Sequence, residues 1–544
     1  MAALLSNARF FANPSHAGDH NAGFRDSMVV RNGRIEHIGS SADEAIVQAR
    51  ATASSVIDLG GRVVTPGFID AHMHLLHFGT ALRKLELKVC TSLDEIRHAI
   101  RAFAQAHPDA PRILCKGWMY ASTDRIGLAS MIDDLDTRPI FIEASDLHST
   151  WCNTAALKEL RADSLPDPPG GAVHRDDSGR PSGLLSEAAH FDYVWTFLAD
   201  VMTTEEKHAA LEEAVKAYSA GGYTGMVDMA MDENTWAVVR EFCGRRKPPV
   251  RIAAHWLIPY TEDEKAISDR VTRAIELHAQ FNATSSPELY IAGVKLIGDG
   301  IVDGCTAALH QPYSHPETNA DPIWPKDPML AVVQRADAAG LQCAIHAIGD
   351  RTVTQAIDVL ATVASPEKRH RIEHLELTTP EDARRLGELG ITASVQPVHL
   401  DPAWFTAWPS LIGAHRCQRA FAYKEFLDGG APLALGTDSP TAKHLPLPNL
   451  YNATTRRSAT DPNMTERVNE QYALPLASAV TAATAGAAYS CRTDQWRGSL
   501  KPGYMADFVV LDFDWNPDTL LQGRVLQTWF GGKKVFDSSV GLTG

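Results

Sequence analysis

The chain has 544 residues, of which 44% are hydrophobic and 22% charged, and its formal net charge is −15 at pH 7. This composition is typical of a globular protein, and the acidic charge argues against a nucleic-acid or anionic-membrane partner. No apolar run reaches about 18 residues and the amino terminus lacks a signal-peptide pattern, so we expect a cytoplasmic protein with no membrane partner. The eight cysteines are scattered without CxxC pairs, which predicts reduced thiols.

Both ends of the chain carry the pattern of short β-strands. These signals lie at residues 27–39, 56–64, 506–512 and 527–536. The first and last contain Asn32-Gly33 and Gly531-Gly532, which predict tight hairpins, and residues 56–64 predict a further pair of short strands. We therefore predict a composite β-sandwich domain built from residues 1–64 and 490–544.

The middle of the chain alternates short apolar strands with helical segments, such as Thr204–Ala220 and Pro380–Leu389, which is typical of a parallel α/β fold. Eight strands can be placed, the number that a closed (β/α)₈ TIM-like barrel needs. They lie near residues 64–72, 224–229, 251–256, 291–297, 341–346, 370–374, 392–396 and 432–437. The barrel is predicted over residues 65–489. The gap after its first strand is too long for a loop, so we predict an insertion at about residues 80–220 that covers the barrel mouth.

The first barrel strand ends in Thr65-Pro-Gly-Phe-Ile-Asp-Ala-His-Met-His74. Residues two apart in a strand point to the same side, so His72 and His74 can bind one metal ion. A His-x-His pair alone is weak evidence, because a pair of core or surface histidines has the same pattern. However, further ligand-type residues end later strands, at the rim where barrel active sites form. They are Lys295, His346, His374 and Asp438.

Lys295 lies in the apolar sequence Gly293-Val-Lys-Leu-Ile297, where a charged amine is costly to bury. A neutral lysine amine can react with carbon dioxide to form a carbamate, whose two oxygens can bridge two metal ions. Imidazole and carboxylate groups are good zinc ligands, and bound zinc lowers the pKa of water toward about 7. Asp438 is then expected to accept the proton of that water and return it to the leaving group.

Together these motifs resemble the amidohydrolase superfamily and, within it, the family-3 branch. The segments PGFIDAHMH, SDLH, GVKLIGDG, IHAIGD, RIEHLE and LGTDSP occur in the family's order. The resemblance implies a barrel plus a composite β-sandwich, and hydrolysis of an amide-type C–N bond, such as that of an N-substituted formamide. It also implies two zinc ions bridged by carboxylated Lys295, with one ion as the alternative. The implied metal-site residues are His72, His74, Lys295, His346, His374 and Asp438.

Three further residues are candidates for contact with a small-molecule substrate. His148 follows an apolar segment that lies near the active site in the resembled branch. It is interpreted as a catalytic or substrate contact at the developing oxyanion, with a hydrogen-bonded histidine at a strand end as the alternative. Trp118 can form an aromatic wall or belong to the core. His399 follows strand seven, which usually offers no metal ligand in this superfamily, and is interpreted as a substrate contact.

Two other classes of function are compatible with the same residues. The metal site could serve a deaminase, or an enzyme that opens a lactone or cyclic amide, and only the shape of the pocket distinguishes these. A non-enzymatic binding barrel is expected to lack one or more ligands, yet all are present. A homodimer fits the sequence. Asp299 can orient a metal ligand, and the sequence assigns no role to Glu187, Cys305 or His310.

Overall fold

A computed structural model of the chain shows two compact units. Unit 1 comprises Met1–Leu75 and Val215–Gly544, and unit 2 comprises Leu76–Ala214. The insertion predicted at about residues 80–220 overlaps unit 2. The structure describes residues 2–12, 23–145, 149–168, 171–187, 189–363, 365–461 and 463–540.

Unit 1 contains the predicted barrel as one sheet of eight strands. All neighbouring strands are parallel, and a parallel bridge between Met73 and Ser439 brings the two edges of the sheet together. The α/β barrel prediction is therefore confirmed. In chain order the strands are β5 (Phe68–Met73), β12 (Tyr223–Met231), β13 (Arg251–Leu257), β14 (Leu289–Ile297), β15 (Gln342–Ala347), β16 (Arg371–His374), β17 (Thr392–Val395) and β18 (Leu433–Leu435).

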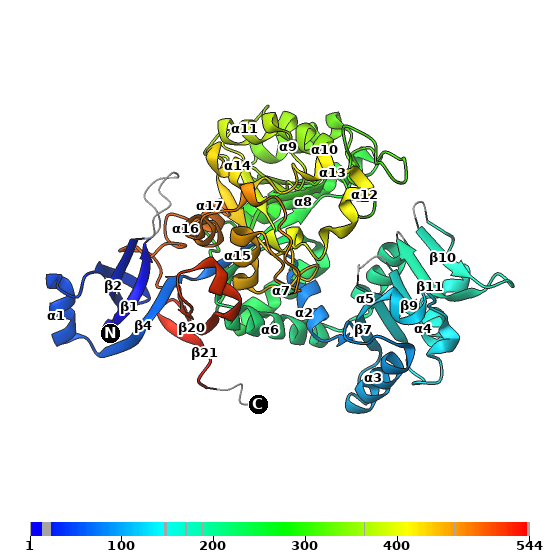
Figure 1. Cartoon of the computed structure of the whole chain (residues 1–544), viewed down its shortest axis with the longest axis horizontal. Coiled ribbons are helices and arrows are strands. Elements are labelled where there is room, and N and C mark those ends of the chain that lie inside the picture. Colours follow the sequence, from blue (N-terminus) through cyan, green and yellow to red (C-terminus); the bar gives the residue numbers. More distant parts are fainter. Residues whose placement is uncertain are drawn as a thin grey trace. The chain divides into compact units, whose positions relative to one another are not determined.

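Helices alternate with the barrel strands and cover their outer side, so the strands are buried on both faces (Figure 1). β5 and β16 accordingly consist only of buried residues, as expected for a covered parallel sheet. Helix α11 has a capped amino terminus. The Thr379 hydroxyl accepts a hydrogen bond from the Asp382 amide, and a proline occupies the first turn. The alternating helices are α6 (Thr204–Ala220), α7 (Glu233–Arg246), α8 (Glu264–Gln280), α9 (Lys326–Ala338), α10 (Asp350–Leu360) and α11 (Pro380–Glu388).

The later part of unit 1 adds shorter helices after β17 and β18. Among them α15 carries a proline in its first turn and is followed by Arg456, which has a left-handed backbone. They are α12 (Trp408–Ile412), α13 (Ala414–Cys417), α14 (Tyr423–Asp428), α15 (Pro446–Thr455), α16 (Leu476–Thr481) and α17 (Ala487–Ser490).

Strands from both ends of the chain join in one seven-stranded sheet of unit 1, coloured blue and red in Figure 1. The two predicted hairpins are present. Asn32 and Gly33 have φ values of 51° and 79°, which a two-residue hairpin turn requires. The strands are β1 (Ala2–Ala12), β2 (Gly23–Arg31), β3 (Arg34–Gly39), β4 (Ser55–Pro66), β19 (Phe508–Asp512), β20 (Arg524–Phe530) and β21 (Lys533–Asp537).

β4 corrects two details of the sequence analysis. Residues 56–64 form one strand rather than two, because Gly60 and Gly61 adopt positive φ and let the strand continue through an irregularity in its pairing with β1. β4 also extends to Pro66, which pairs with Phe508 of β19. The first barrel strand therefore begins at Phe68, and residues 64–66 belong to the terminal sheet.

Unit 2 has a six-stranded sheet of its own. Helix α3 (Leu93–Ala106) buries Ile96, Ile100 and Ala104, which are four residues apart and lie on one helical face. Lys84 and Glu143 form a partly buried ion pair at 3.0 Å, and the Trp195 indole also donates to Glu143. The strands are β6 (Leu85–Glu86), β7 (Ile113–Trp118), β8 (Ile140–Ala144), β9 (Ser149–Cys152), β10 (Gly171–Arg175) and β11 (Pro181–Glu187).

All eight cysteines carry free thiols. Burial raises the pKa of the Cys243 thiol to about 12, so it is protonated at neutral pH. In the described part of the chain, no helix has both the length and the apolar character needed to span a bilayer.

Candidate metal centre

The predicted metal ligands lie at the carboxyl ends of five barrel strands. Because the strands are parallel, these ends meet at one rim of the barrel. His72 lies in β5, His74 is the first residue after β5, and Asp438 follows β18. The ligands are His72, His74, Lys295 in β14, His346 in β15, His374 in β16 and Asp438.

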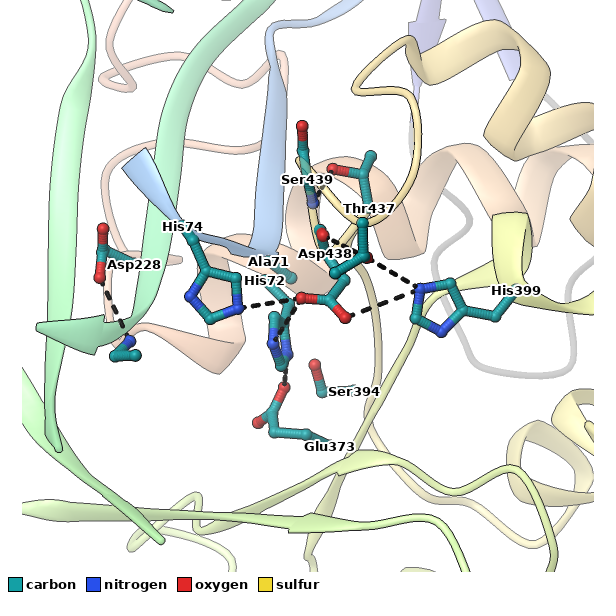
Figure 2. A network of polar contacts seen from close by, with 12 residues as sticks. Ala71, His72, His74, Asp228, Glu373, Ser394, His399, Thr437, Asp438 and Ser439 are labelled. Carbon is teal, nitrogen blue, oxygen red and sulfur yellow. Dashed lines mark hydrogen bonds and ion pairs between the residues drawn. The ribbon is translucent and has the colours of Figure 1, made fainter. Parts of the chain in front are cut away.

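Figure 2 shows that His72 and His74 point toward the carboxylate of Asp438. Nε2 of His74 lies 3.0 Å from Oδ1 of Asp438, and Nε2 of His72 lies 3.4 Å from the same oxygen. The ring of His374 lies 4.9 Å from that of His72 and 4.3 Å from that of His346. Ligand atoms of His72, His374 and Asp438 all lie within 4.8 Å of one another. The fold therefore brings imidazoles from three strands to one carboxylate.

The backbone around these ligands is held in an uncommon conformation. Asp438 and His374 have φ values of 54° and 77°, in the left-handed region that few residues other than glycine, asparagine, aspartate and histidine adopt. The backbone carbonyl of His72 accepts a hydrogen bond from the Asp438 amide at 2.7 Å. The backbone amide of His74 donates to the backbone carbonyl of Ser439 at 2.9 Å. These bonds join the ends of β5 and β18 and fix the relative position of three ligands.

Three imidazoles of the centre, those of His72, His346 and His374, are neutral at neutral pH. Burial, followed by the charge of Lys295, lowers the pKa of His72 to about 4 and that of His346 to about 3. Burial also lowers the pKa of His374 well below its ordinary value. Burial alone lowers the pKa of His74 as well, but the hydrogen bond to Asp438 and the charge of that carboxylate outweigh burial and raise the pKa above its ordinary value. A neutral imidazole is the form that binds a metal ion.

Lys295 is only 3% exposed, and its Nζ has no hydrogen-bond partner among the described residues. Burial lowers its pKa to about 8, although the charges of Glu373 and Asp438 act in the opposite direction. Nδ1 of His374 is also buried without a partner in the described ranges. Buried polar atoms are normally paired. This donor set, with an unpaired amine beside neutral imidazoles and a carboxylate, fits a bound divalent metal ion.

Glu373 holds His72 from the side away from Asp438. Its carboxylate accepts a hydrogen bond from Nδ1 of His72 at 2.7 Å and is also bound by the guanidinium of Arg371. Burial by itself raises the pKa of Glu373, but Arg371 and His72 outweigh it and hold that pKa well below its ordinary range. With Nδ1–H directed to Glu373, Nε2 of His72 is left as the ligand atom.

His399 reaches the same centre from the turn η5 (Pro397–Leu400) after β17. Its Nε2 lies 3.7 Å from Oδ2 of Asp438, and its Nδ1 lies 3.1 Å from Oε1 of Glu376. The ring is parallel to that of His374, with centroids 5.9 Å apart. The structure thus places His399 beside the predicted ligands, and its contact with substrate stays a prediction. The sequence analysis did not identify Glu376.

Comparison with known proteins identifies the family. Residues 55–536 match the model of the Amidohydrolase family. The chain belongs to this family. The resemblance found in the sequence motifs is therefore confirmed.

Several relatives of this amidohydrolase match along most of its length. It is 30% identical to Protein LONG AFTER FAR-RED 3 of Arabidopsis thaliana, over 98% of this chain and 91% of that protein. It is 27% identical to the putative amidohydrolase YtcJ of Bacillus subtilis, over 94% and 96% of the two chains. It is 24% identical to N-substituted formamide deformylase of Arthrobacter pascens, over 93% and 94%. An uncharacterized metal-dependent hydrolase from Pyrococcus horikoshii shares the fold, with a TM-score of 0.78, 23% identity and coverage of 95% and 98%.

Two buried carboxylates shape the backbone of the amidohydrolase site. Asp70 accepts hydrogen bonds from the Thr437 amide and from the Tyr218 hydroxyl, both at 2.9 Å, and burial raises its pKa to about 6. It therefore ties β5 to the segment that carries Asp438. Asp228 of β12 accepts from the Leu75 amide at 2.9 Å (Figure 2). The sequence analysis missed both because their partners are distant in the chain.

Asp299 follows β14 and organises the loop beside His346. Its carboxylate accepts hydrogen bonds from the amides of Ala308, Ile348 and Gly349, at 2.9 to 3.0 Å. Oδ1 of Asp299 also lies 3.5 Å from Nε2 of His346. Asp299 thus fixes the loops after β14 and β15, on which the position of His346 depends.

Trp118, one of the residues predicted to contact substrate, lies in the core of unit 2. Trp118 has no exposed surface, its indole donates to the Thr123 hydroxyl, and its ring packs against Trp151 in the core of unit 2. This position matches the core alternative. His148 lies outside the described residues.

Replacing Glu373 with Gln is expected to weaken the binding of a divalent metal ion, with zinc as the probe, by about 10- to 100-fold, because His72 loses the charged acceptor that orients its ring. Competition with a chromophoric chelator measures the affinity. Glu381→Gln is the matched control, since that carboxylate is 61% exposed on α11 and pairs with the surface residue Arg384. Equal zinc affinity in wild type and Glu373→Gln would show that Glu373 does not orient His72.

Proposed function

We propose that the chain is a metal-dependent hydrolase that cleaves an amide-type C–N bond of a small molecule. One observation carries this proposal. Neutral imidazoles, a carboxylate and an unpaired buried lysine converge at the carboxyl rim of an amidohydrolase barrel. The names of relatives such as N-substituted formamide deformylase support an amide bond as the substrate.

The residues proposed to hold the metal are the six predicted ligands. We propose zinc, as two ions if Lys295 is carboxylated and as one ion otherwise. When bound, zinc polarises a carbonyl group and lowers the pKa of a water molecule toward about 7. The six ligands are His72, His74, Lys295, His346, His374 and Asp438.

Asp438 is proposed to carry the proton. Burial raises its pKa, but His72 and His74 outweigh this effect and lower the pKa from its ordinary value, so the carboxylate is charged and can accept a proton. The attacking water bonds to the carbonyl carbon and gives a proton to Asp438. The C–N bond then breaks, its electron pair goes to nitrogen, and Asp438 returns the proton to that nitrogen.

His399 is proposed to contact the substrate. Its Nε2 faces Asp438 at 3.7 Å, and Glu376 holds the opposite ring nitrogen at 3.1 Å. A ring held on one side by a carboxylate keeps a defined orientation. These contacts support the proposal that His399 hydrogen-bonds a polar group of the substrate next to the carboxylate that moves the proton.

The test uses full-length protein made metal-free with a chelator and then reconstituted with zinc. N-substituted formamides, other secondary amides, a lactam, a lactone and an aminated heterocycle are offered to both forms. We expect zinc to restore hydrolysis of at least one amide to acid plus amine, with no turnover by the metal-free form. Ammonia release from the heterocycle alone would indicate a deaminase. A lack of amide hydrolysis by zinc-loaded protein would contradict the proposal.

A further inference from the structure

β17 lies between β16, which ends in His374, and β18, which Asp438 follows. None of the six predicted metal ligands lies in β17. Glu373 of β16 pairs with Ser394 of β17, and Val395 pairs with Leu435 of β18. The residue after Val395 therefore lies at the level where the metal ligands leave the neighbouring strands. That residue is Gln396.

The inward face of β17 is identified by Ser394. Its hydroxyl accepts a hydrogen bond from Arg371 at 2.7 Å, inside the barrel, and Figure 2 shows Ser394 beside Glu373 and below Asp438. Side chains alternate along a strand, so residues two apart share a face. Thr392 thus shares the inward face of β17 with Ser394, at the opposite end of the strand from the metal centre. Gln396 is the first residue after β17 and keeps an extended φ of −121°, so the same alternation, continued by one residue, assigns it to this face.

Gln396 is 1% exposed, yet neither Oε1 nor Nε2 of its side chain has a hydrogen-bond partner within the described ranges. Its backbone, by contrast, is well held. The carbonyl accepts hydrogen bonds from the His399 amide at 2.9 Å and from the Tyr423 hydroxyl at 3.4 Å. A buried amide that leaves both polar atoms unpaired is rare. An amide in such a position, at the rim that carries the metal ligands, points to a partner that is not part of the chain.

We propose that Gln396 is a specificity-determining residue whose side-chain amide hydrogen-bonds an amide group of the substrate. This inference rests on the proposed function and names its substrate class. Oε1 accepts from an N–H and Nε2 donates to an oxygen, so the complementary ligand carries an N–H and a carbonyl close together. Secondary amides, lactams and ureas have both groups. Tertiary amides and esters lack the N–H and leave Oε1 unpaired.

The test compares Gln396→Met with Thr392→Val in zinc-loaded protein. Both changes keep side-chain volume nearly constant, and each removes buried polar atoms that have no partner in the described structure from the same strand face. We expect neither variant to lower the melting temperature, because no hydrogen bond within the chain is lost. Only Gln396→Met is expected to lower kcat/KM for a secondary amide, by about tenfold or more, with a much smaller effect on its N-methylated tertiary analogue. Thr392→Val is expected to keep both rates.

Equal losses on the two substrates, or unchanged selectivity in Gln396→Met, would overturn the inference. A large fall in melting temperature for Gln396→Met alone would also overturn it, since the amide would then serve the fold. Calorimetric binding of N-methylbenzamide and N,N-dimethylbenzamide to wild type and Gln396→Met separates this inference from the proposed function. Tighter binding of the N–H ligand that depends on Gln396 supports the inference even if no amide is hydrolysed. Equal binding of the two ligands by wild type, or no binding of either, contradicts it.

Discussion

Asp438→Asn is expected to abolish turnover, with kcat lowered by at least about 10³-fold, while the protein keeps its fold and much of its zinc. Asp438 is the one group that lies within 3.7 Å of His72, His74 and His399 among the described carboxylates of the centre. The amide of asparagine retains an oxygen for contact with the histidines. It cannot accept and return a proton at neutral pH, so the proton transfer is lost.

The backbone conformation at position 438 can be adopted by asparagine as well as by aspartate. Asp438 has a φ of 54°, and asparagine adopts the left-handed region at little cost, so no strain is added. Asp124 offers a matched control, because it has a φ of 51° and is exposed. Asp124→Asn is expected to keep wild-type kcat. Steady-state rates, circular dichroism and zinc content are measured for both variants, and turnover by Asp438→Asn within tenfold of wild type would refute the proton role.

Lys295→Met is expected to reduce zinc occupancy and to lower kcat/KM by about 10³-fold, equivalent to several kcal/mol of lost transition-state stabilisation. Methionine fills a similar volume but cannot form a carbamate. The exposed Lys326, whose side chain is 54% accessible, provides the control, and Lys326→Met is expected to keep both zinc and activity. Zinc content is measured together with steady-state kinetics, and full activity in Lys295→Met would remove this lysine from the site.

The same substitution is expected to stabilise the metal-free protein. The pKa of Lys295 is about 8 in the folded chain against an ordinary value of 10.5, so burial penalises the charged amine. This penalty is fully present below about pH 8, and it disappears as the pH rises above 10.5 and the amine becomes neutral in both states. The gain in unfolding free energy of Lys295→Met over metal-free wild type is therefore largest below pH 8. Denaturant unfolding at several pH values measures it.

Carboxylation itself can be observed by mass. In bicarbonate buffer, native mass spectrometry of zinc-loaded wild type is expected to show the added mass of one carbon dioxide, which Lys295→Met lacks. The modified fraction is expected to rise from neutral pH toward pH 8, because the carbamate forms from the neutral amine and the pKa is about 8. Active, zinc-loaded wild type with an unmodified lysine would contradict the carbamate.

The sequence by itself determined the barrel, the terminal hairpins and the set of candidate metal ligands. Each of these has a local signal. His72 and His74 end an apolar run, and Lys295 interrupts another. Strand periodicity and residue chemistry act over a few neighbouring residues, so they can be recognised without knowing what the strand packs against. The prediction that residues 56–64 form two strands was wrong. β4 continues as one strand because it pairs with β1 on both sides of Gly60 and Gly61, and its pairing with β19 extends it to Pro66.

Only the tertiary structure decided which groups hold and complete the site. Glu373 and His72 are 301 residues apart in the chain, and Asp70 and Thr437 are 367 residues apart, so no local pattern joins them. The unpaired amide of Gln396 is equally invisible in the sequence, because the absence of a partner depends on every side chain around it. Closing a parallel barrel brings the ends of distant strands together, and partners across that rim are set by strand order and register rather than by sequence spacing.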